Sequence, residues 1–85
     1  MTTLDQKLIH TILQEIDSSL SRGILPVHNG HLKHLLEEGE LMNYLLSMKS
    51  DGLISGDLVT RGINGTPYRM TNIRLTYVGI KALRT

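Results

Sequence analysis

Three histidines, His28, His31 and His34, follow one another at intervals of three residues in the segment HNGHLKH. Imidazole is a common ligand of transition metals, and residues three apart share one side of a helix. Glu38, four residues after His34, could join them. Helical metal pairs are more often spaced His-x-x-x-His, however, and His28 is expected to precede the helix. The pattern therefore favours solvated histidines over a zinc or nickel site, and we expect no cofactor.

The acidic residues give no stronger sign of catalysis. Glu37, Glu38 and Glu40 cluster, but nothing in the sequence predicts a pocket around them. The chain has no cysteine, no phosphate-binding loop of the P-loop type and no Gly-x-Ser-x-Gly nucleophile elbow. We therefore expect a protein that is not an enzyme, and the missing cysteines fit a reducing cytoplasm.

The charges divide unevenly between the two parts of the chain. Residues 1–60 carry four Lys or Arg and eight Asp or Glu, whereas residues 61–85 carry five Lys or Arg and no acid. A basic end of this kind favours contact with an anionic partner such as nucleic acid. The alternative is that the basic end pairs with the chain's own acidic part.

Much of this positive charge surrounds the segment RGINGTPYRM, residues 61–70. Asn64 and the glycine after it form the strongest short signal for a tight hairpin turn. Arg61 and Arg69 flank the turn, and Arg74 follows in the next stretch. A small polar tip of this kind can enter a minor groove, where arginine is favoured. Alternatively, the arginines are surface charges that keep an edge strand from aggregating, and the hairpin only closes a small core.

Apolar spacing predicts the elements that position these residues. A first helix starts at a Thr3–Gln6 capping box and ends at Gly23, and Thr76 caps a short last helix. Between them we expect five further elements. They are a brief edge strand or extended link at 24–27, a helix at 31–38 capped by Asn29, a helix at 40–51, and strands at 53–61 and 68–75.

This order, α-β-α-α-β-β-α, resembles the winged-helix arrangement, an α+β fold in which a helix-turn-helix precedes a two-stranded hairpin wing. LLSMKSDGLISGDLV (residues 45–59) resembles a third helix running into the first wing strand. IRLTYVGIKAL (residues 73–83) resembles the Leu-Thr-x-x-Gly exit from the wing, with Leu75, Thr76 and Gly79 in place. Nearly the whole chain is similar to small bacterial and prophage proteins of the YjcQ-like family. The resemblance implies one winged-helix domain over residues 1–85, with Gly39 in the turn between helices two and three.

In a DNA-binding helix-turn-helix, the second helix of the pair enters the major groove. Its exposed residues would be Asn43, Tyr44, Ser47 and Lys49, of which Asn43 could pair with adenine. Three glutamates at the start of this helix would repel phosphate. The alternative is therefore a solvated helix face.

These observations favour a winged-helix protein that binds double-stranded DNA, of the kind that phages and prophages use as transcriptional regulators. A homodimer through the first or final helix would suit a two-fold DNA site. The alternative is a winged-helix module that binds a protein partner and no DNA. No apolar run approaches the roughly 18 residues of a membrane span, and the N-terminus does not resemble a signal peptide. We therefore expect a cytoplasmic protein without a membrane contact.

Overall fold

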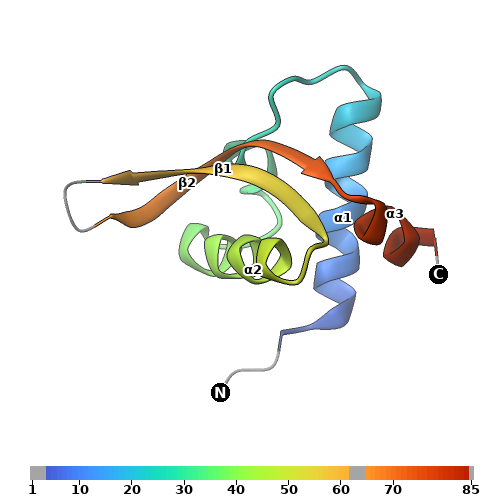
Figure 1. Ribbon diagram of the computed structural model, residues 1–85, viewed down its shortest axis with the longest axis horizontal. Helices are drawn as coiled ribbons and strands as arrows, with labels where there is room; N and C mark the ends of the chain where they lie inside the picture. The colour runs from blue at the N-terminus through green and yellow to red at the C-terminus, as the bar shows by residue number, and fades with distance from the viewer. Residues whose placement is uncertain (1–3, 62–64, 85) are drawn as a thin grey trace.

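The computed structural model describes residues 4–61 and 65–84, and for Arg61 and Thr66 the backbone alone. Within these residues the fold is α+β, with three α-helices and one two-stranded antiparallel sheet (Figure 1). The elements in chain order are α1 (Gln6–Ser21), the 3-10 helix η1 (Asn29–Leu32), α2 (Glu38–Ser50), β1 (Ile54–Arg61), β2 (Thr66–Leu75) and α3 (Tyr77–Arg84).

The first helix, α1, packs one apolar side against the core. Ile12, Leu13 and Ile16 are buried on it, as their spacing predicts. The predicted capping box is corrected, because Asp5 is the N-cap and its carboxylate accepts a hydrogen bond from Lys7 N at 2.9 Å. Thr3, the cap expected from the sequence, lies outside the described residues.

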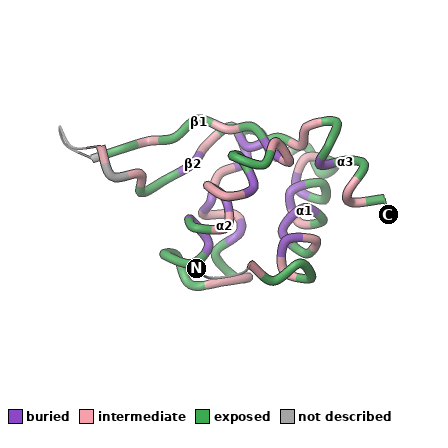
Figure 2. The backbone as a smooth tube through the Cα atoms, turned by 60° about the horizontal axis from the view of Figure 1, so that its bottom comes forward, coloured by how far each residue is buried: buried purple, intermediate pink, exposed green. Residues whose placement is uncertain are grey.

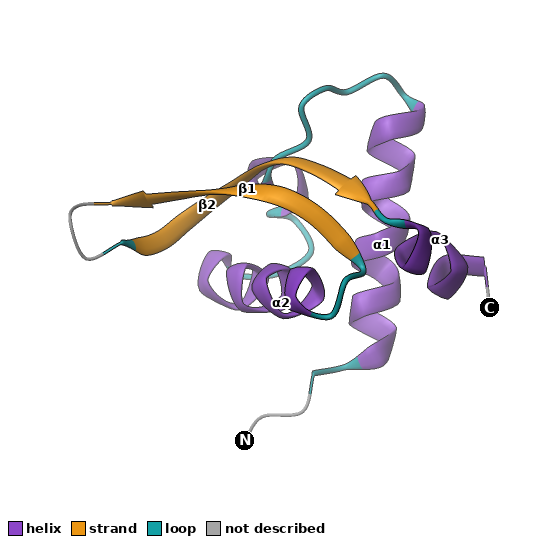
Figure 3. Cartoon of the chain, in the orientation of Figure 1, coloured by secondary structure: helices purple, strands orange, loops and turns teal. Residues whose placement is uncertain are grey.

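A long loop leaves the end of α1 and returns beside the hairpin (Figure 3). The strand predicted at residues 24–27 is wrong, and the alternative of an extended link is right. Among the described residues, one backbone bond joins this link to the sheet, from Ile73 N to Val27 O at 2.9 Å. Pro26 has no N–H with which to extend a ladder.

The second predicted helix, at residues 31–38, is also wrong. The structure has the short η1 followed by turns, and His28 rather than Asn29 is its N-cap. Leu32 and Leu35 are three apart, a spacing that successive 3-10 turns satisfy as well as an α-helix does. The apolar pattern therefore could not distinguish the two.

The next helix, α2, begins two residues earlier than predicted. Glu37 is the N-cap and Gly39 lies inside the first turn, so Gly39 does not form the turn between two helices. A Cβ at Gly39 would meet nothing within 4 Å, so the helix passes through this position without a clash.

The core lies between the two long helices and the inner half of the hairpin, as the buried segments in Figure 2 show. The hairpin contributes the side chains of Ile54, Met70 and Ile73, which are at most 2% exposed. The predicted hairpin is thus confirmed, and half of it closes the core. The buried apolar residues are Ile9, Ile12, Leu13, Ile16, Val27, Leu32, Leu41, Met42, Leu45, Met48, Ile54, Met70 and Ile73.

The last helix, α3, is capped by Thr76, as predicted. Gly79 N donates to Thr76 Oγ1 at 3.0 Å, and Thr76 N donates to Leu53 O at 3.1 Å. Thr76 therefore joins the start of α3 to the start of β1.

None of the helices in the described part of the chain has the length and apolarity that crossing a membrane requires.

Candidate nucleic-acid interface

The hairpin projects from the body of the molecule. Figure 1 shows the end of β1 and the start of β2 reaching beyond α2, away from α1 and α3. Leu58, on the inner side opposite Met70, is already 39% exposed. Beyond this pair the side chains of Thr60 and Arg69 are exposed, so both are accessible to a partner.

Two bulges on β2 determine which way its side chains point. Ser55 pairs with Arg74 and Asp57 with Thr71, so β2 has one residue more than β1 between these pairs. Asn72 lies in this bulge and adopts a left-handed backbone conformation, with a φ of 55°. A regular strand would put residues three apart on opposite faces, whereas the bulge buries both Met70 and Ile73.

The outer edge of β2 is held by what we call the histidine turn, residues 27–31. Asn29 Oδ1 accepts from Met70 N at 3.2 Å, and Val27 O accepts from Ile73 N at 2.9 Å. Met70, Ile73 and Val27 are fully buried. These two bonds satisfy buried amides of β2 that β1 does not reach, so the histidine turn fixes the base of the hairpin to the body.

The strand register places two of the predicted arginines on the outer face of the hairpin. Arg69 pairs with Val59 and Arg74 with Ser55, and directly paired residues share one face of a sheet. Asp57 lies on the same face between them. Both arginines are exposed.

Within the part of the chain that the structure describes, neither arginine forms an ion pair with an acid. Among residues 4–60 and 65–84, no carboxylate lies within 4.0 Å of Arg69 or Arg74. The ion pairs found there are those of Glu15, with Arg22 at 3.9 Å and with His34 at 3.4 Å. The predicted Asn64 and the side chain of Arg61 lie outside the described residues.

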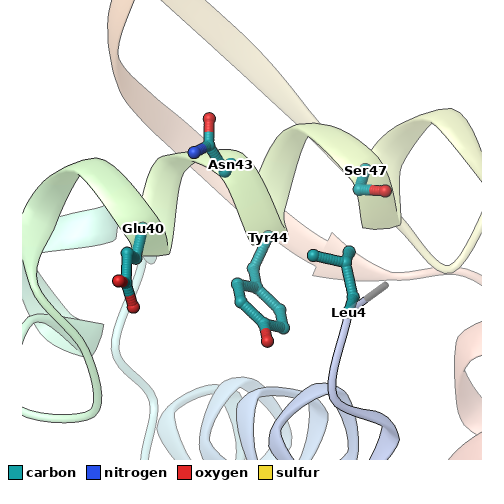
Figure 4. A pocket seen from close by; sticks show the side chains of 5 residues that line it. All are labelled: Leu4, Glu40, Asn43, Tyr44 and Ser47. Carbon is teal, nitrogen blue, oxygen red and sulfur yellow. The ribbon is translucent and has the colours of Figure 1, made fainter. Parts of the chain in front are cut away.

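The residues predicted on the third helix gather around a hollow on α2. Asn43, Tyr44 and Ser47 line it with Glu40 and Leu4, and it has a volume of about 510 Å³ (Figure 4). Figure 4 shows that Tyr44 and Asn43 point in different directions. These side chains therefore do not form one row that faces a groove together.

The chain before α1 covers part of this helix face. Asp5 N donates to the Tyr44 hydroxyl at 3.0 Å, a contact between residues 39 apart in sequence. Tyr44 is thereby used within the fold, while Asn43 and Lys49 remain exposed. No local sequence pattern predicts a contact between residues so far apart.

Two exposed glutamates occupy the first turn of α2. Glu38 and Glu40 lie where the positive end of the helix dipole stabilises acids, and Lys49 lies in the last turn. The charges suit the helix, but they put negative potential where a recognition helix would meet phosphate.

The three histidines do not converge on one point. His28 and His31 are in ring contact, with centroids 3.9 Å apart, whereas His34 Nε2 lies 3.4 Å from Glu15 Oε1 on α1. Nδ1 of His28 and Nδ1 of His31 each accept a backbone N–H. An imidazole that binds a metal through one nitrogen donates a hydrogen bond from the other nitrogen. Nδ1 of these two rings accepts instead, so the pair is not arranged as a set of metal ligands. In the described part of the chain, no three His, Asp or Glu side chains gather as metal ligands.

The last helix, α3, carries the remaining basic residues of the C-terminal part of the chain. Lys81 and Arg84 occupy its last turn, and Lys81 Nζ lies 5.5 Å from the centre of the Tyr77 ring. Tyr77 is 75% exposed and Val78 52% exposed. This helix therefore presents apolar and basic groups together.

Comparisons of the chain with models of protein families, with curated proteins and with solved structures each found no match.

Proposed function

We propose that the chain is a winged-helix DNA-binding domain that contacts the phosphate backbone mainly through its hairpin. The order of α1, η1, α2 and an antiparallel hairpin supports this proposal, with η1 and α2 in the place of the helix-turn-helix. The resemblance to YjcQ-like prophage proteins and a role in regulating transcription belong to the same proposal.

The observation that carries the proposal is the pair of exposed arginines on the projecting hairpin that form no ion pair within the described residues. Arg69 and Arg74 are exposed on one face, without a carboxylate within 4.0 Å in the described residues. Arginine binds phosphate oxygens in a planar fork, and it is favoured in narrow minor grooves. The hairpin is a better contact than α2, because acids occupy the first turn of α2 and Tyr44 is engaged by Asp5.

The test is fluorescence anisotropy with a labelled duplex of mixed sequence, at low and at near-physiological salt. We expect binding that weakens with salt, and a shallower salt dependence in the Arg69→Ala, Arg74→Ala variant. Each lost phosphate contact should reduce the slope of log K against log salt by about one. Arg22→Ala is the control for the loss of an exposed arginine outside the hairpin, since Arg22 is the C-cap of α1.

Two results would contradict the proposal. The first is no binding by the wild type even at low salt. The second is a double variant that binds and responds to salt like the Arg22→Ala control.

A protein partner, or a second copy of the chain, is the alternative that α3 favours. Tyr77 and Val78 are large apolar residues that the fold leaves uncovered, and Lys81 and Arg84 flank them. Sedimentation equilibrium should then show a mass that rises with concentration, and a Tyr77→Ser, Val78→Ser variant should remain a monomer. A wild type that is monomeric throughout would remove the homodimer from consideration.

A further inference from the structure

The histidine turn is closed by two histidine rings. His28 lies between Val27 and Asn29, the two residues that hold the outer edge of β2. Gly30 N donates to His28 Nδ1 at 2.9 Å, and His28 N donates to His31 Nδ1 at 3.2 Å. The two side chains thus form a reciprocal capping box, with histidines where serine and glutamate are more usual.

In both bonds Nδ1 of the ring is the acceptor. A backbone N–H can only donate, so Nδ1 of each histidine must present a lone pair. A neutral imidazole with this requirement carries its hydrogen on Nε2. A proton added at Nδ1 of either ring would face a backbone N–H, and the capping bond would be lost.

The surroundings of His28 also oppose a positive charge there. Burial, the neighbouring His31 and Arg69 together hold the pKa of His28 below its ordinary value of 6.5. The His28 and His31 rings are 3.9 Å apart, so two charged rings would repel each other. Tyr68 and Arg69 from β2 and Glu38 from α2 line the same hollow as His28. Glu38 would favour a charged ring, but its carboxylate is more than 4.0 Å from the imidazole nitrogens, within the described residues.

We propose that the His28–His31 pair is a pH-sensitive clasp that fastens the hairpin to the body at neutral pH and releases it on acidification. Protonation breaks the capping bonds of the turn. Val27 O and Asn29 Oδ1 are then no longer held in position beside β2. The amides of Met70 and Ile73 then lose their acceptors, while the pairing of β1 with β2 remains. The clasp goes beyond DNA binding and stands whether or not the hairpin contacts DNA.

The sign of the effect on stability follows from the pKa of His28. Because that pKa is lower in the folded chain than in the unfolded chain, the folded chain binds fewer protons. The contribution of the clasp is therefore complete above about pH 6.5 and decreases as the pH falls from there through the folded pKa.

The experiment is a pH titration of the ¹⁵N-labelled chain by NMR from about pH 7.5 to about pH 5, following ring and amide signals together. In the wild type we expect the Met70 and Ile73 amides to shift with the His28 ring, at a midpoint below 6.5. The His28→Asn, His31→Gln variant keeps acceptors at both capping positions without a titrating ring. In this variant the pH-dependent shift of both amides should disappear.

The control is His34→Gln, which removes a histidine that pairs with Glu15 and leaves the clasp intact. It should titrate like the wild type at Met70 and Ile73. Constant amide signals while the His28 ring protonates would overturn the proposal, as would a wild-type amide titration in the double variant. If the double variant fails to fold, the His31→Gln single variant replaces it. The pH-dependent shifts of its Met70 and Ile73 amides should be smaller than those of the wild type. DNA binding is measured separately by anisotropy at neutral pH, so its failure leaves these outcomes unchanged.

Discussion

Gly79 packs directly against the carbonyl group of Leu53. A Cβ placed at Gly79 would lie 2.0 Å from Leu53 O and 3.1 Å from its carbonyl carbon. The first turn of α3 can therefore approach the start of the hairpin only without a side chain at this position. Together with the Thr76 cap, this contact gives the Leu-Thr-x-x-Gly pattern a physical basis.

Replacing Gly79 with alanine should destabilise the fold, because the obstacle is backbone and cannot rotate away. We expect a loss of about 2 kcal/mol or more in the free energy of unfolding, measured by urea denaturation. Gly39→Ala is the matched control, since a Cβ there meets nothing within 4 Å and the position is helical. It should be neutral or gain up to about 1 kcal/mol. Equal effects at both glycines would argue against the Leu53 contact.

The bulge at Asn72 should depend on a residue that tolerates a left-handed backbone. Asn72→Val puts a β-branched side chain at a φ of 55°, and we expect it to cost about 1–2 kcal/mol in urea unfolding. Asn72→Gly accepts this φ and should stay within about 0.5 kcal/mol of the wild type. The side chain of Asn72 is exposed, so lost packing does not confuse the comparison. A valine variant as stable as the glycine variant would show that the bulge is not required.

The acids of α2 should oppose DNA binding while they stabilise their helix. Glu38→Gln and Glu40→Gln should each strengthen binding to a mixed-sequence duplex at low salt, by up to about fivefold. Each should also cost about 0.3–1 kcal/mol of stability through the helix dipole. Asp17→Asn removes the same charge from an exposed position on α1 and should leave the affinity unchanged. If all three variants bind alike, α2 does not lie near the DNA.

The Tyr44 hydroxyl should hold the chain before α1 in place. Tyr44→Phe removes the acceptor for Asp5 N, and we expect faster hydrogen exchange at that amide with a stability loss below about 1 kcal/mol. Tyr77→Phe is the control, because the hydroxyl of this exposed tyrosine has no such bond in the described residues. Unchanged exchange at Asp5 in the Tyr44→Phe variant would contradict the contact.

The hairpin, the helices α1 and α2 and the Thr76 cap of α3 were predicted from the sequence, because each depends on residues close together in the chain. Its strands alternate imperfectly, and the structure explains why. Met70 and Ile73 are both buried although they are three residues apart, since a bulge lies between them. Which residue takes the left-handed conformation depends on the pairing register, which composition does not define.

The charged residues of the candidate site could be predicted from the sequence, but the contacts of its other residues could not. Arg69 and Arg74 could be selected from the uneven charge distribution and placed on a hairpin. The roles of Tyr44 and Asn29 could not, since their partners, Asp5 and Met70, are 39 and 41 residues away. The spacing of His28 and His31 did match a capping box, and that was the available signal for the histidine turn.

The histidine turn also has a consequence for the order in which the chain folds. The strands β1 and β2 follow each other directly in the chain, whereas Asn29 and Met70 are 41 residues apart. Closing the longer loop costs more chain entropy, and it needs β2 already formed to supply a partner. The hairpin can therefore assemble before its outer edge is fastened. Substitutions at Asn29 should accordingly accelerate unfolding more than they slow folding, as expected for a contact made after the transition state.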